Sequence, residues 1–402
     1  MDRKSFLNYF LNVPVAVNNL YGDPFFPIQK ENTFNKLEKL KETNHRGIVG
    51  IITKTELNKD EVKILKELNE YLNLIILVSC SELPYEIEKV GGNRYNSLSG
   101  CVQAGIPVIA YVRPFIPEYN TKREVIEEIF KKVHDSGCKR VVVSGLRGTD
   151  EMLKDSNIKS EELKNWSLRV KIIPSNIRDY IDKFSSQYNL KVYDRTSCGI
   201  SAELGLSHSY NPYYHSPQLA KCNRCELKNT CFDNQQLFIP TSEDIEFIKL
   251  LGYHPKIANE GQFEICKVDP LKRMECVSCC TCCFMLKRYS IELTDKNICL
   301  GDLGLLRLLT HKLVFKKGII DRGEKDIAKP KNPLLNSSNL YILNSWWSYS
   351  RNVSSCYNCS YCIVKHYNKE KENGFNEECG DVPLHVGEKI WNERERRIKN
   401  EK

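Results

Sequence analysis

The chain has 402 residues, of which 41% are hydrophobic and 27% charged, and this composition is typical of a folded protein rather than a disordered one. No run reaches the roughly 18 apolar residues that span a bilayer, and the first residues lead into no signal-peptide core. We therefore expect a cytoplasmic protein with no membrane partner. The net charge of +8 permits a nucleic-acid partner without requiring one.

Eighteen cysteines are distributed unevenly along the chain. The cytoplasm keeps thiols reduced, so we expect few disulfides. Cys80, Cys101 and Cys138 lie singly in the first 197 residues, where a cysteine is usually a small core residue. The other fifteen fall between Cys198 and Cys379, and their density predicts metal binding.

The first 145 residues alternate between short apolar runs and amphipathic segments. The apolar runs predict strands at residues 13–17, 47–54, 74–79, 107–114 and 140–145. Helices are predicted between them at residues 33–40, 61–72, 94–104 and 122–134, and a further helix and strand at 176–188 and 190–193. Nearly continuous apolar strands that alternate with helices indicate a parallel sheet, either a barrel or an open doubly wound sheet.

Polar residues recur where these strands end. They are Asp23, Thr53, Lys54, Ser79, Arg113 and Ser144. A strand often becomes polar simply because it reaches solvent, but the carboxyl ends of parallel strands also form the ligand-binding edge in both architectures. The glycines near these ends lack the spacing of a phosphate-binding loop, so no nucleotide fingerprint is predicted.

Two cysteine-rich stretches follow the predicted sheet. The first comprises Cys198, Cys222, Cys225 and Cys231, and four thiols at such spacing bind either zinc or an iron–sulfur cluster. The second comprises Cys276, Cys279, Cys280, Cys282 and Cys283. Five thiols in eight residues exceed what one tetrahedral ion needs, so some are spare or belong to a second centre.

A third cysteine motif lies near the C-terminus. Cys356, Cys359 and Cys362 follow a predicted strand at residues 340–347 and precede a predicted helix that begins at Ile363. Three thiols at this spacing can hold an iron–sulfur cluster or part of a zinc site. The tail, residues 391–402, is predicted to be a charged helix or a frayed end.

Residues 15–29, VAVNNLYGDPFFPIQ, with the helix that follows and then Ile51-Ile52-Thr53-Lys54, resemble radical SAM enzymes of the spore photoproduct lyase-like group. The likeness extends from Pro14 to Ser197. Tyr21-Gly22-Asp23-Pro24 looks like the family's Gly-Gly-Glu-Pro-like motif. The resemblance implies that Asp23 and the adjoining backbone hold the amino group of S-adenosyl-L-methionine and that Lys54 or Arg113 holds its carboxylate. It also implies a polar side chain near the ribose and an aromatic ring against the adenine. The residues implied are Tyr21, Gly22, Asp23, Pro24, Lys54, Ser79, Arg113 and Tyr361.

The family's first strand and cluster loop should precede Pro14, where this chain has no cysteine. The segment that holds Cys356, Cys359 and Cys362 contains the missing parts, so we expect an α/β fold: a partial TIM-type (β/α)6 barrel, circularly permuted, with a Cys-rich irregular insert. The expected domains are residues 1–197 for barrel strands 2 to 6, 198–330 for auxiliary clusters, and 331–402 for the first β/α unit and tail.

The resemblance implies one catalytic 4Fe–4S cluster and one or more auxiliary clusters, with zinc as an alternative at an auxiliary site. The C-terminal spacing is one residue shorter than the common C-x3-C-x2-C, which Cys276, Cys280 and Cys283 do present, so these two loops compete for the catalytic role. The implied reaction is reductive cleavage of S-adenosylmethionine to a 5′-deoxyadenosyl radical that abstracts hydrogen from a substrate. No catalytic side chain is assigned.

The expected partners are an electron donor of the flavodoxin or ferredoxin type and a substrate that is a nucleic acid, a nucleotide or a peptide. Two alternative interpretations remain open. In the first, the chain is a non-catalytic nucleic-acid-binding protein with structural zinc. In the second, it is an inactive radical SAM-like partner subunit.

Overall fold

The computed structural model of this protein describes most of the N-terminal half and separate pieces of the remainder. The described residues are 1–17, 23–145, 173, 175–194, 196–205, 226, 240–258, 290–293, 306, 309–310, 314–317, 347–349 and 382–400. Among them, no helix combines the length and the apolar character that crossing a membrane requires.

A seven-stranded sheet in the order β10-β1-β2-β3-β4-β5-β6 forms the centre of the fold, and every neighbouring pair is parallel. Its strands are β1 (Val15–Val17), β2 (Ile48–Thr53), β3 (Asn73–Ser79), β4 (Val108–Phe115), β5 (Arg140–Gly145), β6 (Lys191–Tyr193) and β10 (Trp347–Tyr349). The predicted α/β class and parallel sheet are confirmed. A doubly wound sheet reverses its strand order, so the sequential order from β1 to β6 fits a partial barrel-like fold instead.

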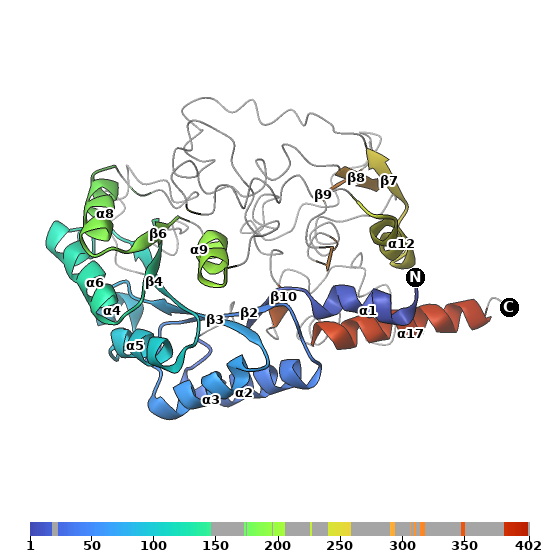
Figure 1. Ribbon diagram of the computed structural model, residues 1–402, viewed down its shortest axis with the longest axis horizontal. Coiled ribbons are helices and arrows are strands. Elements are labelled where there is room, and N and C mark those ends of the chain that lie inside the picture. Colours follow the sequence, from blue (N-terminus) through green and yellow to red (C-terminus); the bar gives the residue numbers. More distant parts are fainter. Residues whose placement is uncertain are drawn as a thin grey trace.

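Helices cover the outer side of the curved sheet (Figure 1). They are α2 (Pro27–Glu42), α3 (Lys59–Asn69), α5 (Arg94–Ala104), α6 (Arg123–Asp135) and α8 (Ser175–Gln187), while the short α4 (Tyr85–Glu88) lies in the connection after β3. Local sequence defines their ends: Asn58 and Glu61 form a capping box at the start of α3, and Gly105 ends α5 in the left-handed conformation. Because parallel crossovers are right-handed, sequentially ordered strands place their helices on the same face.

The two faces of the sheet carry separate apolar clusters. Ile76 and Val78 of β3 pack under the helices, whereas Ile75 and Leu77 belong to a cluster on the inner face. Side chains alternate between faces along a strand, so both faces are buried and the strand is apolar throughout. The inner-face cluster comprises Ile48, Ile75, Leu77, Ile109, Tyr111, Val142, Tyr193, Ile200 and Ala202.

Helix α9 (Thr196–Glu203) lies inside the curve of the sheet, against β4, β5 and β6 (Figure 1). Gly199 allows this close approach, because a Cβ there would lie 2.6 Å from Cγ2 of Val142 and 3.4 Å from Cδ1 of Ile109. The expected domain boundary between residues 197 and 198 falls within this helix. Cys198 therefore lies on an element that packs on the sheet.

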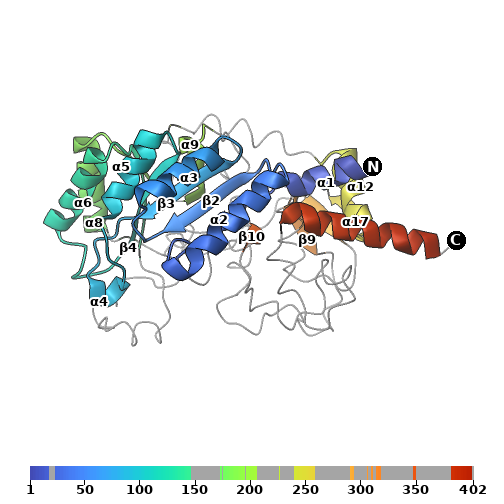
Figure 2. The same cartoon turned by 90° about the horizontal axis from the view of Figure 1, so that it is seen from below.

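The N-terminal helix α1 (Arg3–Leu11) and the C-terminal helix α17 (Pro383–Asn400) lie side by side (Figures 1 and 2). Phe6 of α1 contacts Trp391 of α17 and Phe247 of α12 (Ser242–Leu250), with ring centroids 5.2 Å apart in both pairs. Gly387 lies against Phe10. We predicted no helix at α1, and α17 begins eight residues before the predicted tail helix because its buried Pro383, Val386 and Ile390 extend the apolar face.

Strand β10 is the C-terminal segment of the sheet. Its Trp347, Ser348 and Tyr349 pair in parallel with Val15, Ala16 and Val17 of β1. The strand predicted at 340–347 overlaps it at Trp347, and residues 340–346 lie outside the described residues. Separately, β7 (Pro255–Ala258), β8 (Ser290–Leu293) and β9 (Val314–Lys317) form a small mixed sheet.

We predict that Gly199→Val destabilises the protein by about 2 kcal/mol, because overpacking a closely packed site costs roughly 1–3 kcal/mol. The free energy of unfolding is measured by urea denaturation. Gly91→Val is the matched control, since a Cβ at Gly91 meets no atom within 4 Å. Equal effects of the two substitutions would contradict this account of α9.

Candidate functional site

The carboxyl ends of the strands bring the predicted polar residues to one edge of the sheet. The registers pair Thr53 with Val78 and Ser79 with Tyr111, so Lys54 follows β2 beside Ser79. Arg113 lies two residues beyond Tyr111, on the same inner face. Asp23, Lys54, Ser79 and Arg113 are therefore brought to a shared edge, as predicted from the sequence.

Asp23 connects the loop after β1 to the end of β2. Its carboxylate accepts hydrogen bonds from the Phe25 amide (2.9 Å), the Thr53 hydroxyl (2.8 Å), the Thr55 amide (3.2 Å) and the Lys54 amide. The side chain is buried. Four donors from the chain itself occupy this carboxylate, so its oxygens are satisfied without a ligand.

Lys54 is held by a buried glutamate. Its Nζ lies 3.0 Å from Oε1 of Glu88, whose side chain is only 2% exposed. Arg94, 11% exposed, pairs with the other carboxylate oxygen, and the Ser81 hydroxyl donates to Glu88 at 2.9 Å. Two cations and one carboxylate leave this cluster with a net positive charge.

The surroundings of Glu88 decide its ionisation. Burial by itself would raise its pKa, but the charges of Lys54 and Arg94, together with their hydrogen bonds, hold the pKa of Glu88 below its ordinary value. The same pairing raises the pKa of Arg94 although burial opposes it. Glu88 is therefore a carboxylate throughout the neutral range.

Asn120 joins the loops after β3 and β4. Its fully buried side-chain amide donates to the Ser81 carbonyl (2.6 Å) and the Pro114 carbonyl (2.9 Å), while its oxygen accepts from the Ile116 amide (2.6 Å). The Ser81 hydroxyl in turn binds Glu88. Asn120 and Glu88 thus fix the ends of β2, β3 and β4 relative to one another.

Arg113 is in a different environment from Lys54. Its guanidinium carbon lies 4.4 Å from the centroid of the Tyr111 ring, and the Tyr111 hydroxyl is 2.7 Å from Oγ1 of Thr196 at the start of α9. Arg113 forms no ion pair with any residue in the part of the chain that the structure describes. Its charge is therefore uncompensated within that part of the chain.

Ser79 and Cys198 flank this region. Ser79 ends β3 and is 2% exposed. Cys198 is half-buried on α9 and packs against the inner-face cluster. By contrast, Cys80, Cys101 and Cys138 are buried, as predicted, and burial raises the pKa of each thiol, to about 12 for Cys101 and about 11 for Cys138.

The remaining predicted site residues lie outside the described residues. They are Tyr21, Gly22 and Tyr361, together with Cys222, Cys225, Cys231, Cys276, Cys279, Cys280, Cys282, Cys283, Cys356, Cys359 and Cys362. Among the described residues, no three His, Cys, Asp or Glu side chains form a group that could hold a metal ion. Pro24 is described and buried, and its carbonyl accepts from the Thr33 hydroxyl at 2.7 Å.

Several residues at this edge were not predicted from the sequence: Glu88, Arg94, Tyr111, Asn120 and Thr196. Glu88 lies between predicted elements and Arg94 begins a predicted helix, and no spacing marks either residue as a partner of Lys54. The position of Tyr111 beside Arg113 could have been predicted, because Tyr111 precedes Arg113 by two residues in a predicted strand and side chains two apart share a face.

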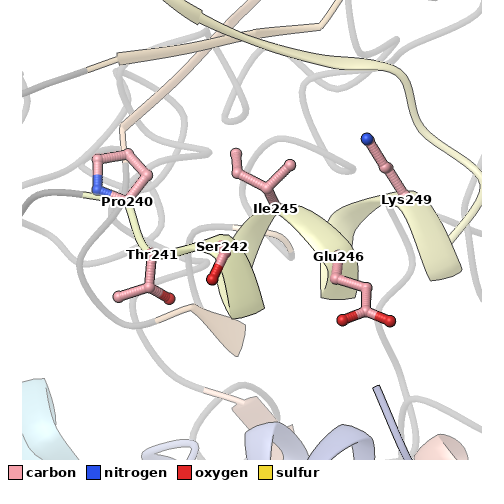
Figure 3. A pocket seen from close by; sticks show the side chains of 6 residues that line it. All are labelled: Pro240, Thr241, Ser242, Ile245, Glu246 and Lys249. Carbon is pink, nitrogen blue, oxygen red and sulfur yellow. The ribbon is translucent and has the colours of Figure 1, made fainter.

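A pocket of about 420 Å³ lies along α12, lined by Pro240, Thr241, Ser242, Ile245, Glu246 and Lys249 (Figure 3). Glu246 already pairs with the amino group of Met1. Both overall views place α12 at the opposite end of the molecule from β4 (Figures 1 and 2). This pocket is therefore separate from the strand-end site.

No known protein-family model matches this chain, and no curated protein sequence is significantly similar to it.

We predict that Glu88→Gln lowers the free energy of unfolding by roughly 3 kcal/mol at pH 7, because it leaves the buried Arg94 without its carboxylate. The lowered pKa means that this contribution is present above about pH 4.3, the ordinary glutamate pKa, and is lost as the pH falls toward the pKa of the folded protein. Urea denaturation between pH 3 and pH 7 measures both effects.

Glu86→Gln, an exposed change on the same short helix, is the matched control. The stability of Glu88→Gln should depend less on pH in the acid range than that of the wild type or of the control. Parallel pH profiles for all three proteins would contradict the assigned role of Glu88.

Proposed function

We propose that this protein is a radical SAM enzyme whose first β/α unit comes from the C-terminal part of the chain. The observation that carries the proposal is the parallel pairing of β10 with β1. β10 precedes the Cys356 motif and ends level with Val17, the last residue of β1. Cys356 follows Tyr349 by seven residues, and a chain of that length spans at most about 25 Å, so the cysteine motif would be within reach of that strand end.

The strand-end site suits S-adenosyl-L-methionine in its polar character. The backbone around Asp23 would receive the amino group, since the Asp23 carboxylate is occupied by its own chain. Lys54, whose amide binds Asp23, is the nearer of the two candidate cations for the carboxylate. Ser79, in the next strand beside Lys54, would lie near the ribose.

Cys356, Cys359 and Cys362 would hold the catalytic 4Fe–4S cluster, and Tyr361 would lie against the adenine. When bound, the cluster and S-adenosylmethionine would supply the adenosyl radical that abstracts hydrogen from the substrate. The protein's own contribution is positioning and exclusion of water. The inner-face cluster under α9 and the polar network of Asn120 would provide a rigid, dry base for both.

The permuted order is supported by the positions of the chain ends. Both termini lie at the same end of the molecule in Figures 1 and 2, where α1 packs on α17. A connection from α17 to α1 would therefore give the order β10, cysteine loop, α17, α1, β1. That is the ordinary order of strand, cluster loop, helix and next strand.

The remaining parts of the proposal concern partners. Cys198, Cys222, Cys225 and Cys231, and the group from Cys276 to Cys283, would bind auxiliary iron–sulfur clusters or zinc. An electron donor of the flavodoxin or ferredoxin type would reduce the catalytic cluster. The basic net charge leans toward a nucleic-acid or nucleotide substrate, and a peptide is the alternative.

We predict that anaerobically purified protein contains iron and sulfide sufficient for at least two 4Fe–4S clusters per chain. With dithionite it should convert S-adenosylmethionine to 5′-deoxyadenosine, measured by chromatography. A colourless protein that retains zinc in air would instead support the zinc-containing nucleic-acid-binding alternative. If the protein contains iron–sulfur clusters but forms no 5′-deoxyadenosine, the result would support the alternative that the chain is an inactive partner subunit.

The two candidate cluster loops are distinguished by matched cysteine substitutions. We predict that Cys359→Ala abolishes 5′-deoxyadenosine formation and removes one cluster's share of iron, because three thiolates are needed to hold the catalytic cluster. Cys280→Ala should retain the reaction. The reverse pattern would move the catalytic role to the Cys276–Cys283 loop.

We predict that a re-permuted chain folds. Its ends, Lys402 and Met1, are joined by a ten-residue Gly/Ser linker, which reaches about 18 Å, and it begins at Pro333. Circular dichroism and thermal unfolding should match those of the original chain, because every strand keeps its neighbours. The control is the original chain with the same linker added after Lys402 and not joined to Met1. If the control folds and the re-permuted chain does not, the proposed connection is contradicted.

A further inference from the structure

Arg113 and Ser144 lie near the carboxyl ends of the neighbouring strands β4 and β5. Tyr111 and Val142 pair in the register of β4 and β5, and both belong to the inner-face cluster. Two residues later on each strand come Arg113 and Ser144. The guanidinium of Arg113 returns to the inner face, because it lies over the Tyr111 ring, whereas the register of β4 and β5 shifts between Val112 and Phe115. Arg113 therefore lies one level above the apolar cluster, at the carboxyl end of the strands.

We infer that Arg113 binds an oxyanion of the substrate, either a carboxylate or a phosphate, and does not bind the carboxylate of the cofactor. The inference rests on the proposed function only where it names S-adenosylmethionine as the cofactor that binds elsewhere on this edge. The oxyanion site itself is argued from the environment of Arg113.

The guanidinium of Arg113 is oriented before any ligand arrives. The guanidinium carbon lies over the ring of Tyr111, which is 5% exposed and whose hydroxyl is hydrogen-bonded to Thr196. Stacking uses the flat face of a guanidinium and leaves its N–H edges available for two parallel hydrogen bonds. Such bidentate geometry suits carboxylate and phosphate oxygens equally.

The charge of Arg113 also distinguishes it from its neighbours. Lys54 and Arg94 share Glu88, and Arg140 of β5 pairs with Glu203 of α9 at 2.7 Å. Arg113 has no acidic partner among the residues that the structure describes. A cation that is already oriented and still uncompensated attracts an anion, and the half-buried position strengthens this attraction relative to open solvent.

Distance separates this position from the proposed cofactor carboxylate. β2 and β4 lie on either side of β3, and Arg113 lies two residues beyond the level of Lys54, so the backbones at Lys54 and Arg113 are about 12 Å apart. The two oxygens of one carboxylate are only about 2 Å apart, so a single group that engages both cations would need long reaches from each. Lys54 lies beside the Asp23 loop, whereas Arg113 lies beside α9. Two anionic groups therefore fit this edge better than one.

The test uses the full chain and two small anions. Binding of inorganic phosphate and of acetate is measured by isothermal titration calorimetry for the wild type, Arg113→Gln and Arg113→Lys. We expect Arg113→Gln to weaken binding at least tenfold and Arg113→Lys to weaken it less, because a lysine keeps the charge but not the bidentate edge. Arg46→Gln, an exposed arginine at the opposite edge of the sheet, is the matched control and should bind as the wild type does.

The two anions distinguish the two sources of an oxyanion. Preference for phosphate would indicate a phosphorylated substrate, and preference for acetate a carboxylate-bearing one. No binding of either anion by the wild type, or equal weakening by Arg46→Gln, would overturn the site. Circular dichroism of each variant establishes that it is folded.

A second measurement separates this inference from the proposed function. Equilibrium dialysis of S-adenosylmethionine should give the same dissociation constant, within about twofold, for the wild type and Arg113→Gln. A tenfold or larger weakening would overturn the inference, because Arg113 would then hold the cofactor. If the chain does not bind S-adenosylmethionine at all but retains Arg113-dependent anion binding, the proposed function fails and the oxyanion site stands.

Discussion

The parallel, sequential pairing of the strands is the constraint on which the rest of this structure depends. Each parallel neighbour requires a crossover, and right-handed crossovers in sequential order place the covering helices on one face of the sheet. The other face needs its own cover, which α9 provides over β4, β5 and β6 through the close contact at Gly199. The carboxyl ends of the strands then converge on one edge, where the polar residues lie.

The pairing of β10 with β1 extends this constraint to the C-terminal part of the chain. A strand more than 300 residues distant in sequence occupies the position that a preceding β/α unit would take. The aromatic contacts of Phe6 with Trp391 and Phe247 hold the two terminal helices and α12 together beside it. This arrangement is the main support for the proposed permuted barrel. The pairing of β10 with β1 and the packing of α1 on α17 bring the two ends of the chain to the same end of the molecule, as a permuted order requires.

Electrostatics at the strand ends divides the candidate site into two parts. Glu88 and Asp23 are buried carboxylates that serve the protein itself, one by holding Lys54 and Arg94 and the other by accepting four donors. Arg113 lies over an aromatic ring and has no carboxylate partner among the residues that the structure describes, so its charge is uncompensated there. The contrast between Lys54 and Arg113 is one of environment, since both are cations at the ends of parallel strands.

The sequence by itself determined the α/β class and the strands from β1 to β6, because near-continuous apolar runs such as Leu74 to Val78 can be buried on both faces only in a covered parallel sheet. It also placed Asp23, Lys54, Ser79 and Arg113 at strand ends, since each follows or ends such a run. Strand order, the choice against a doubly wound sheet, and the place of β10 required the tertiary structure, because local periodicity does not encode which strands become neighbours. The same holds for Glu88: only folding brings a short helix after β3 against a lysine after β2, so the pairing of Lys54 with a buried carboxylate is decided by the tertiary structure.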